Sequence, residues 1–141
     1  MTLVVDASVA FKWFVNEPDS TVAIATRGSD RDLIAPELVV SEVCNSAWKS
    51  FRRGQLTAVQ CEIIATSIAP AFAHLIGHAS LAQRAMAIAT DLSHPVYGCL
   101  YLALAERERT VVVTADGRLV GRVQGTPYAT FVRHLSTYPT A

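Results

Sequence analysis

The sequence predicts an α/β fold, a three-layer α/β/α sandwich around a mostly parallel sheet, and two observations support this prediction. Runs such as "TLVV" at 2–5 and "TVVVT" at 110–114 are apolar throughout, as strands covered on both faces are. Segments with a helical spacing of apolar residues separate these runs, as expected where helices connect parallel strands. The chain has 141 residues, of which 51% are hydrophobic, and we expect one domain over residues 1–141.

Strands and helices are expected to alternate along the chain. The expected strands are "TLVV" at 2–5, "LIA" at 33–35, "FAHLI" at 72–76, "TVVVT" at 110–114 and "YATFVR" at 128–133. The expected helices lie near 7–15, 20–28, 37–53, 57–69, 79–92, 96–108 and 117–123. Pro36 in the first turn of the third helix and Gly54 just after its end are typical of helix boundaries. Ligands of such sheets bind outside the carboxyl ends of the strands, so polar residues that follow strands are site candidates.

Charge and cysteine usage exclude several classes of protein. The chain has 12 basic and 12 acidic residues, which excludes a highly basic nucleic-acid coat and leaves room for a local basic patch. No CxxC pair occurs, which favours free thiols in a reducing cytosol over a zinc site or disulfides. The amino-terminal stretch has no features of a secretion signal. The longest uncharged run, 63–83, contains a proline, a glycine and two histidines, so we expect no membrane span and a cytoplasmic protein.

Two aspartates follow strands that are expected to be buried. Asp6 comes directly after the strand at 2–5, and Asp116 follows the strand at 110–114 after one alanine. Both therefore lie at the carboxyl ends of strands, where a site is expected. Each aspartate can also be explained as the cap of the helix that begins after it, because Asp is a favoured N-cap residue.

Glu42 lies on the apolar side of the helix expected at 37–53. It follows Leu38 by four residues and Val39 by three, so the helical period directs it inward. A buried carboxylate is costly unless it is paired with a cation or neutralised, which leaves two alternatives, a salt bridge and a metal ion. Asn45, one turn further on, could orient Glu42, although such an asparagine is more often a surface or packing residue.

Together the three acids, Asp6, Glu42 and Asp116, indicate a negatively charged pocket. No basic residue adjoins them in the sequence to neutralise this charge. Oxygen ligands of this kind suit Mg²⁺ or Mn²⁺, which also bind substrate phosphates. A divalent ion held by carboxylates can activate water and stabilise the transition state of phosphodiester cleavage.

The chain resembles the PIN-domain ribonucleases, and among them the VapC toxins of bacterial toxin–antitoxin pairs. The resemblance covers nearly the whole chain. It rests on "VVDASVAFKWF" at 4–14, "APELVVSEVCNSAWK" at 35–49, "HPVYGCLYLALAE" at 94–106 and "VVTADGRL" at 112–119. The resemblance implies a single PIN-like domain and a metal-dependent endoribonuclease that cuts single-stranded or loop regions of RNA, often transfer or ribosomal RNA.

The resemblance also implies roles for particular residues. Asp6, Glu42 and Asp116 match three acidic positions of the family, which would make them the catalytic residues and the ligands of Mg²⁺ or Mn²⁺. Thr114 matches a hydroxyl that borders the metal, while Ser8 and Asn45 match supporting polar residues. The implied partners are an RNA substrate, a VapB-type antitoxin and a second copy of the chain in a homodimer, with DNA bound only indirectly through the antitoxin.

Gly98 departs from the family pattern, which has an aspartate at this place in "HPVYDxLYLALA". Glycine inside a helix costs about 1 kcal/mol relative to alanine, so its presence needs a reason. One explanation is close packing, which a side chain would block. The other is the loss of a metal ligand, natural or selected because the intact enzyme harms its host. If a ligand is lost, we expect little RNA cleavage at low Mg²⁺ and a gain on Gly98→Asp.

Two functions therefore remain open at the level of sequence. One is a weakened or inactive VapC-like nuclease, and the other is a catalytically dead PIN fold that acts as an antitoxin-binding module. For RNA contacts, the phosphate backbone needs cations near the pocket. The candidates are Lys12, Lys49, Arg52 and Arg53, although "KSFRRG" could also be a solvated helix end whose cations suit the helix dipole.

Overall fold

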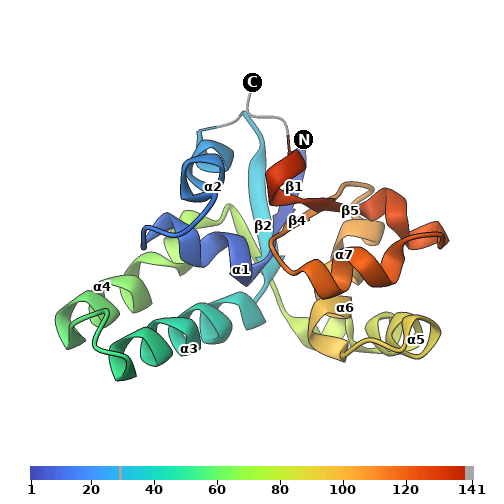
Figure 1. Cartoon of the computed structure of the whole chain (residues 1–141). Coiled ribbons are helices and arrows are strands. Elements are labelled where there is room, and N and C mark those ends of the chain that lie inside the picture. Colours follow the sequence, from blue (N-terminus) through green and yellow to red (C-terminus); the bar gives the residue numbers. More distant parts are fainter. Residues whose placement is uncertain (29, 139–141) are drawn as a thin grey trace.

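A five-stranded sheet lies at the centre of the structure, a computed structural model that describes residues 1–28 and 30–138 (Figure 1). The strand order is β3-β2-β1-β4-β5, and all pairs of neighbouring strands are parallel. The strands are β1 (Thr2–Val5), β2 (Asp32–Pro36), β3 (His74–Ile76), β4 (Val112–Thr114) and β5 (Val132–His134). The predicted fold class is confirmed, with a sheet that is parallel throughout rather than mostly parallel.

The central strands are buried on both faces, as their uninterrupted apolar sequences predict. Val4 and Val5 of β1 are fully buried, and so are Val112 and Val113 of the neighbouring β4. In the register of these two strands, Val4 lies beside Val112 and Val5 beside Val113. A strand of this kind is stable only where helices cover the sheet on both sides.

Helices form the two outer layers. They are α1 (Ala7–Ala10), α2 (Ser20–Arg27), α3 (Leu38–Arg52), α4 (Ala58–Ser67), α5 (Ala82–Leu92), α6 (Val96–Arg107) and α7 (Gly117–Val123). Figure 1 shows α1 to α4 on one side of the sheet and α5 to α7 on the other. Helix α6 is buried from Cys99 to Ala105 because it lies between the sheet and α5. Within the described residues, no helix has both the length and the apolar character needed to cross a membrane.

Three local details differ from the sequence-based expectation. Most of the strand expected at 128–133 is the 3₁₀ helix η4 (Pro127–Phe131), because the Thr126 side chain caps Tyr128 N–H and starts a turn that Pro127 favours. The helix expected at 7–15 is α1 followed by the 3₁₀ helix η1 (Phe11–Trp13). Pro36 is the last residue of β2 and precedes α3, whereas Gly54 follows α3 with a φ of 74°, as expected of a helix end.

The order in which strands are added to the sheet reverses its direction at β1. The chain runs from β1 through β2 to the edge strand β3, and then returns across the sheet to β4 on the other side of β1. In open parallel sheets, ligands bind at such a reversal, outside the carboxyl ends of the strands. Asp6 directly follows β1 and Asp116 lies two residues after the end of β4, so both aspartates are at this point.

Candidate functional site

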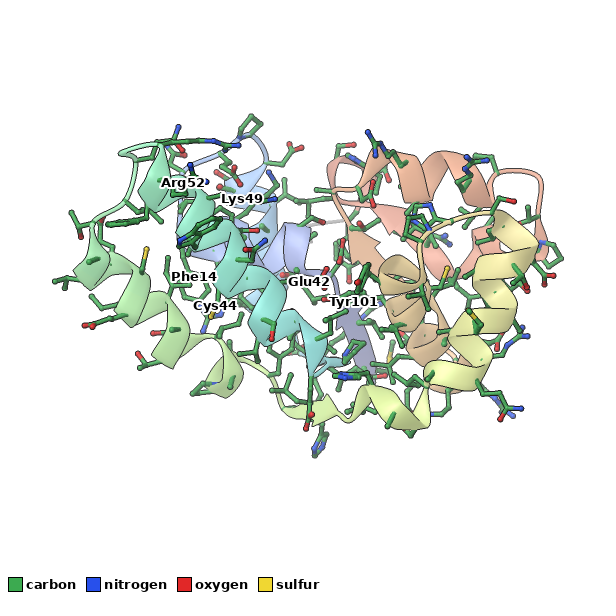
Figure 2. All side chains as sticks on the ribbon, turned by 90° about the horizontal axis from the view of Figure 1, so that it is seen from below. Phe14, Glu42, Cys44, Lys49, Arg52 and Tyr101 are labelled. Carbon is green, nitrogen blue, oxygen red and sulfur yellow. The ribbon has the colours of Figure 1, made fainter. Side chains whose placement is uncertain are left out.

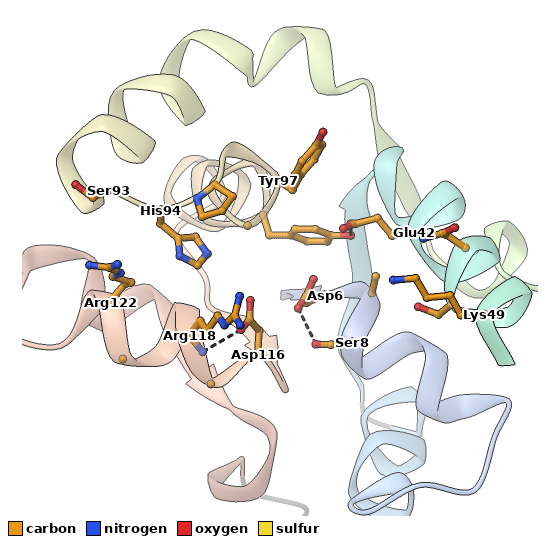
Figure 3. Close-up of a pocket in the computed structure, with 18 residues that line it drawn as sticks. Asp6, Ser8, Glu42, Lys49, Ser93, His94, Tyr97, Asp116, Arg118 and Arg122 are labelled. Atoms are coloured by element: carbon orange, nitrogen blue, oxygen red, sulfur yellow. Dashed lines mark hydrogen bonds between the residues drawn. The ribbon is translucent and has the colours of Figure 1, made fainter. Parts of the chain in front are cut away.

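The three acids predicted from the sequence line one pocket at the carboxyl ends of β1 and β4 (Figure 3). Asp6 comes from the end of β1, Glu42 from α3 and Asp116 from the start of α7. The pocket has a volume of about 980 Å³, which is at the upper end of the range for ligand-binding clefts. Its other polar or aromatic lining residues include Ser8, Asn45, Lys49, His94, Tyr97, Tyr101, Arg118 and Arg122.

Hydroxyl groups hold the Asp6 carboxylate in place. Oδ2 of Asp6 accepts hydrogen bonds of 2.7 Å from both Ser8 Oγ and Thr114 Oγ1. The same hydroxyls accept from the backbone that leads to Asp116, since Ala115 N donates to Ser8 Oγ and Asp116 N to Thr114 Oγ1. This network links the end of β1 to the end of β4 and gives Ser8 and Thr114 the supporting positions that the resemblance implied.

Burial is the main influence on the acidity of Asp6. Loss of solvent raises the pKa of Asp6, while the hydrogen bonds from Thr114 and Ser8 lower it, and the charge of Asp116 raises it further. The carboxylate side chains are therefore close enough to repel each other. A bound cation would relieve this repulsion, which is one reason to regard the pocket as a cation site.

Glu42 points inward, as the helical period predicts, and contacts a tyrosine rather than a cation. Its Oε1 accepts a 2.6 Å hydrogen bond from the hydroxyl of Tyr101, which is buried in α6 (Figure 2). Burial raises the pKa of Glu42, the bond from Tyr101 lowers it, and the charge of Asp6 raises it. Among the residues that the structure describes, Glu42 forms no ion pair, so the salt-bridge alternative receives no support. Its side chain also makes no hydrogen bond with Asn45 within these residues.

Asp116 caps the helix that follows it, which was the alternative to a site role in the sequence analysis. Its Oδ1 accepts from Arg118 N at 2.9 Å and from Leu119 N at 3.5 Å, at the start of α7. Capping uses one carboxylate oxygen and leaves the residue at the pocket wall, so the capping role and a ligand role are compatible. Asp6 occupies the same position before α1 but its side chain makes no capping bond.

The donor set fits a hard divalent cation in its chemistry. Three carboxylates line the pocket, and within residues 1–28 and 30–138 none of them forms an ion pair. Oxygen donors of this kind suit Mg²⁺ and Mn²⁺. In the same described residues, no three carboxylate, imidazole or thiol groups are already grouped around one point as metal ligands. Glu42 is bonded to Tyr101 and Asp116 to the α7 amides, so an ion shared with Asp6 would require both side chains to turn toward Asp6.

Gly98 lines the same pocket, in the first turn of α6. A Cβ atom built on Gly98 would lie 3.0 Å from Nε2 and 3.3 Å from Cδ2 of His94, and 3.8 Å from Leu119 Cδ1. The imidazole therefore lies in the space that a side chain at position 98 would enter. The atoms that this Cβ would meet belong to the far end of a flexible side chain, so the contact does not decide between packing and the loss of a ligand. It identifies His94 as a pocket residue that the sequence analysis did not select.

The cations around the pocket differ in part from those predicted. Lys49 lines it and extends toward Asp6, but Lys12 pairs with Glu17 at 3.6 Å and lies outside it. Arg52 lies over the Trp48 ring, 5.2 Å from its centroid, and Arg52 and Arg53 border a separate hollow with Trp48. Instead, the opposite wall carries Arg118 and Arg122 of α7. Their spacing of four residues directly after Asp116 would have placed them on one helix face beside the site.

A parallel α/β sheet with acidic residues at its topological reversal defines the class as an α/β fold with its candidate site at the carboxyl ends of the strands. The chain belongs to the PIN domain family, whose model matches residues 3–123. It is of the VapC type, because it is 32% identical over 121 residues to Ribonuclease VapC3 of Pyrobaculum aerophilum. That match covers 84% of this chain and 92% of the relative. PIN nucleases generally use divalent metal ions.

A solved structure supports the fold independently of close sequence similarity. The chain is similar to the crystal structure of PAE2754 from Pyrobaculum aerophilum, with a TM-score of 0.70 and 20% sequence identity. The match covers 97% of this chain and 91% of that one. At this level of identity the likeness concerns the arrangement of helices and strands alone.

Proposed function

We propose that the chain is a VapC-like endoribonuclease that hydrolyses RNA phosphodiesters at the pocket of Asp6, Glu42 and Asp116. One observation supports this most strongly. Three carboxylates from distant parts of the sequence line one pocket at the sheet reversal without an ion pair among the described residues. The chain is also a PIN-domain member with a relative named as a ribonuclease.

In this proposal the acids are metal ligands and the surrounding residues position them. Asp6 and Asp116 would hold Mg²⁺ or Mn²⁺, an ion that supplies an activated water and stabilises negative charge on the phosphate. Ser8 and Thr114 fix the Asp6 carboxylate by their hydrogen bonds. Glu42, oriented by Tyr101, would be a further ligand or would accept a proton from the attacking water.

Cations on two sides of the pocket would hold the RNA backbone. Lys49 of α3 lies on one side, and Arg118 and Arg122 of α7 lie on the other. Phosphate contacts of this kind supply affinity that does not depend on base sequence. The specificity for transfer or ribosomal RNA would then come from base contacts and RNA shape rather than from these cations.

The proposal includes a weakened activity, because Gly98 stands where the family pattern has an aspartate. Even the loss of a residue that only supports a metal ligand costs about 10–100-fold in affinity or activity, and the loss of a ligand should cost at least as much. The nuclease would consequently need a higher concentration of divalent ion than a PIN nuclease with all four acids.

An RNA cleavage assay tests the proposed activity directly. Total RNA is incubated with the purified chain in Mn²⁺, in Mg²⁺ and in a chelator, with Asp6→Ala as the matched control. We expect discrete cleavage in Mn²⁺, weaker cleavage in Mg²⁺, and none with the chelator or the variant. Equal cleavage by Asp6→Ala would show that a contaminant or another site is responsible, and an absence of cleavage at every ion concentration would refute the nuclease.

The second candidate function is a catalytically dead antitoxin-binding module, which the glycine at position 98 favours. For either function we propose a VapB-type antitoxin and a homodimer as partners, DNA binding only through the antitoxin, and a cytoplasmic location. Exposed apolar side chains on α3 and α4 support a protein partner. They are Trp48, Phe51, Val59 and Ile63, which are 46% to 64% exposed. Complex formation without cleavage would favour this second function.

A further inference from the structure

Tyr97 presents an exposed aromatic ring in the lining of the acidic pocket. It lies in the first turn of α6 and is 60% exposed. Of the large apolar side chains that are 46% or more exposed in the described residues, Tyr97 alone lines this pocket. Single exposed apolar residues are normal on a protein surface, so the location of Tyr97, and not its exposure, needs an explanation.

The side chain of Tyr97 has no bonded or stacked partner within the part of the chain that the structure describes. Its hydroxyl makes no hydrogen bond, and its ring neither pairs with another ring nor lies under a cation. By contrast, Tyr101 lies one turn further along α6, is buried and donates to Glu42. Figure 3 shows the Tyr97 ring extending from α6 away from Asp6 and Asp116. The ring is therefore available to a ligand outside the acid cluster.

The surroundings of Tyr97 suit an uncharged, flat group better than a phosphate. Its chain neighbours, Val96 and Gly98, carry no charge. Because Tyr97 and Tyr101 are four residues apart, they lie on one face of α6, with Cβ atoms about 5–6 Å apart. Tyr101 is in turn bonded to the acidic Glu42. A phosphate beside Tyr97 would approach this acid, whereas a nucleobase is uncharged and can stack on the ring.

The pocket has room for a nucleotide in addition to a metal ion. Its volume is about 980 Å³. A metal ion with its waters takes on the order of 200 Å³, at about 30 Å³ for each water. Lys49, Arg118 and Arg122 line the same pocket and can hold phosphates. A ligand that offers phosphates to these cations and a flat ring to Tyr97 is a nucleotide whose base is unpaired.

We propose that Tyr97 is a binding residue on which an unpaired nucleobase of the RNA stacks, next to the phosphate held at the acids. This inference rests on the proposed function and adds to it a residue that selects single-stranded RNA. Phosphate contacts carry no information on the bases, whereas stacking requires a base whose face is free. Every base has such a face, so the ring selects single strands rather than a particular sequence.

The first experiment measures the binding of two ligands in a chelator by fluorescence anisotropy. One is an RNA oligonucleotide without self-complementarity, and the other is an abasic oligomer with the same number of phosphates. We expect Tyr97→Ala to bind the RNA at least about fivefold more weakly and the abasic oligomer unchanged. Tyr97→Phe keeps the ring and should bind both ligands normally. Phe51→Ala is the matched control, because it removes a 46% exposed ring outside the pocket, and it should change neither affinity.

The outcomes separate this inference from the proposed function. If Tyr97→Ala binds RNA like the unaltered chain while Arg118→Ala with Arg122→Ala does not, the RNA site remains and Tyr97 does not contact a base. The exposed ring would then belong to a surface for a protein partner. If Tyr97→Ala weakens the binding of RNA and of the abasic oligomer equally, the residue acts on the fold and the inference is overturned. If the unaltered chain binds no RNA, both proposals are wrong.

A second experiment tests the selection of single strands. The unaltered chain should bind the single-stranded RNA more tightly than a duplex of the same sequence, and Tyr97→Ala should lower this ratio of affinities by at least about fivefold. The affinity for the duplex itself should change little in Tyr97→Ala, because the bases of a duplex are stacked on one another. A ratio that is the same for the unaltered chain and for Tyr97→Ala would show that Tyr97 does not select single strands.

Discussion

The two walls of the pocket are built differently. In the first wall, which consists of Asp6, Ser8, Thr114, Glu42 and Tyr101, every side chain is tied to another. Hydrogen bonds of 2.6 to 2.7 Å join both hydroxyls to Asp6 and Tyr101 to Glu42. These bonds orient Asp6 and Glu42 in the absence of a ligand, although Glu42 would have to turn from Tyr101 to share an ion with Asp6. Burial raises the pKa of both carboxyl groups.

The second wall consists of His94, Gly98, Arg118 and Arg122. Within the described residues, the side chains of His94, Arg118 and Arg122 make no hydrogen bond or ion pair, and both arginines are exposed. The departure from the family pattern, Gly98, lies in this wall. The comparison teaches that hydrogen bonds fix the side chains of the first wall, whereas the side chains of the second wall are not fixed by bonds among the described residues.

The largest expected effect comes from breaking the first wall at Asp6. Asp6→Asn retains an oxygen that can accept from Ser8 and Thr114 but removes the charge. We expect the rate of RNA cleavage in Mn²⁺ to fall by more than about 100-fold, measured in single-turnover assays. Circular dichroism checks that the variant is folded. A fall of less than about threefold would show that Asp6 does not carry the reaction.

The next effect comes from the second wall, where the side chains of both arginines have no hydrogen-bond or ion-pair partner among the residues that the structure describes. Arg118→Ala combined with Arg122→Ala should weaken RNA binding, measured in a chelator, by about tenfold. It should also reduce the slope of log K against log salt by about 1.4, which is about 0.7 for each phosphate contact in single-stranded RNA. The matched control is Arg52→Ala with Arg53→Ala, outside the pocket, and an equal loss there would favour the contacts first predicted from the sequence.

A smaller effect is expected from Tyr101→Phe, which removes one bond of the first wall without changing any charge. The Tyr101 hydrogen bond lowers the pKa of Glu42, so its loss should raise that pKa further. If Glu42 must be ionised to act, the acidic limb of the pH–rate profile will move to higher pH, with a several-fold loss of rate near neutrality. An unchanged profile would show that Glu42 does not titrate in the rate-limiting step.

The first wall should also make stability depend on pH. Burial raises the pKa of Asp6 above its ordinary value of 3.8, so the folded protein keeps a proton that the unfolded chain has already lost. This contribution to stability is complete below the unfolded pKa and is lost as pH rises through the folded pKa. In a chelator, the melting temperature should therefore decline toward neutral pH more for the unaltered chain than for Asp6→Asn. If the melting temperatures of the two proteins changed with pH in the same way, the pH dependence would not come from Asp6.

The difference between the walls also explains how far the sequence could predict this site. Asp6 and Asp116 were predictable because strand ends and caps are local features, and Glu42 because a helical stripe directs it inward. Tyr101 was not predicted as a site residue, because its bond to Glu42 joins residues 59 positions apart. His94 was not predicted, because its place in the pocket depends on how the turn before α6 sets its ring beside Gly98.

The fold was predictable to a similar extent and for similar reasons. Buried strands such as β1 and long helices such as α3 are specified by runs of apolar residues with a clear period. The segment 128–133 was not, because its apolar residues resemble a strand while Thr126 and Pro127 begin a 3₁₀ turn. The Thr126 cap and Pro127 therefore decide the local structure, although the residues that follow them have a high β propensity.

The smallest predicted effect concerns the turn that positions the second wall. Ser93, directly before His94, ends α5 with a φ of 51°, in the left-handed region that costs a non-glycine residue about 1 kcal/mol. Ser93→Gly should remove this cost and raise the free energy of unfolding by up to about 1 kcal/mol, which corresponds to a few degrees in the melting temperature. Because the change acts only on this turn, RNA cleavage and Mn²⁺ affinity should stay within about twofold of the unaltered chain. A stabilised variant with a much weaker Mn²⁺ affinity would show that the strained turn itself shapes the pocket, and that the second wall is more preorganised than its lack of hydrogen bonds indicates.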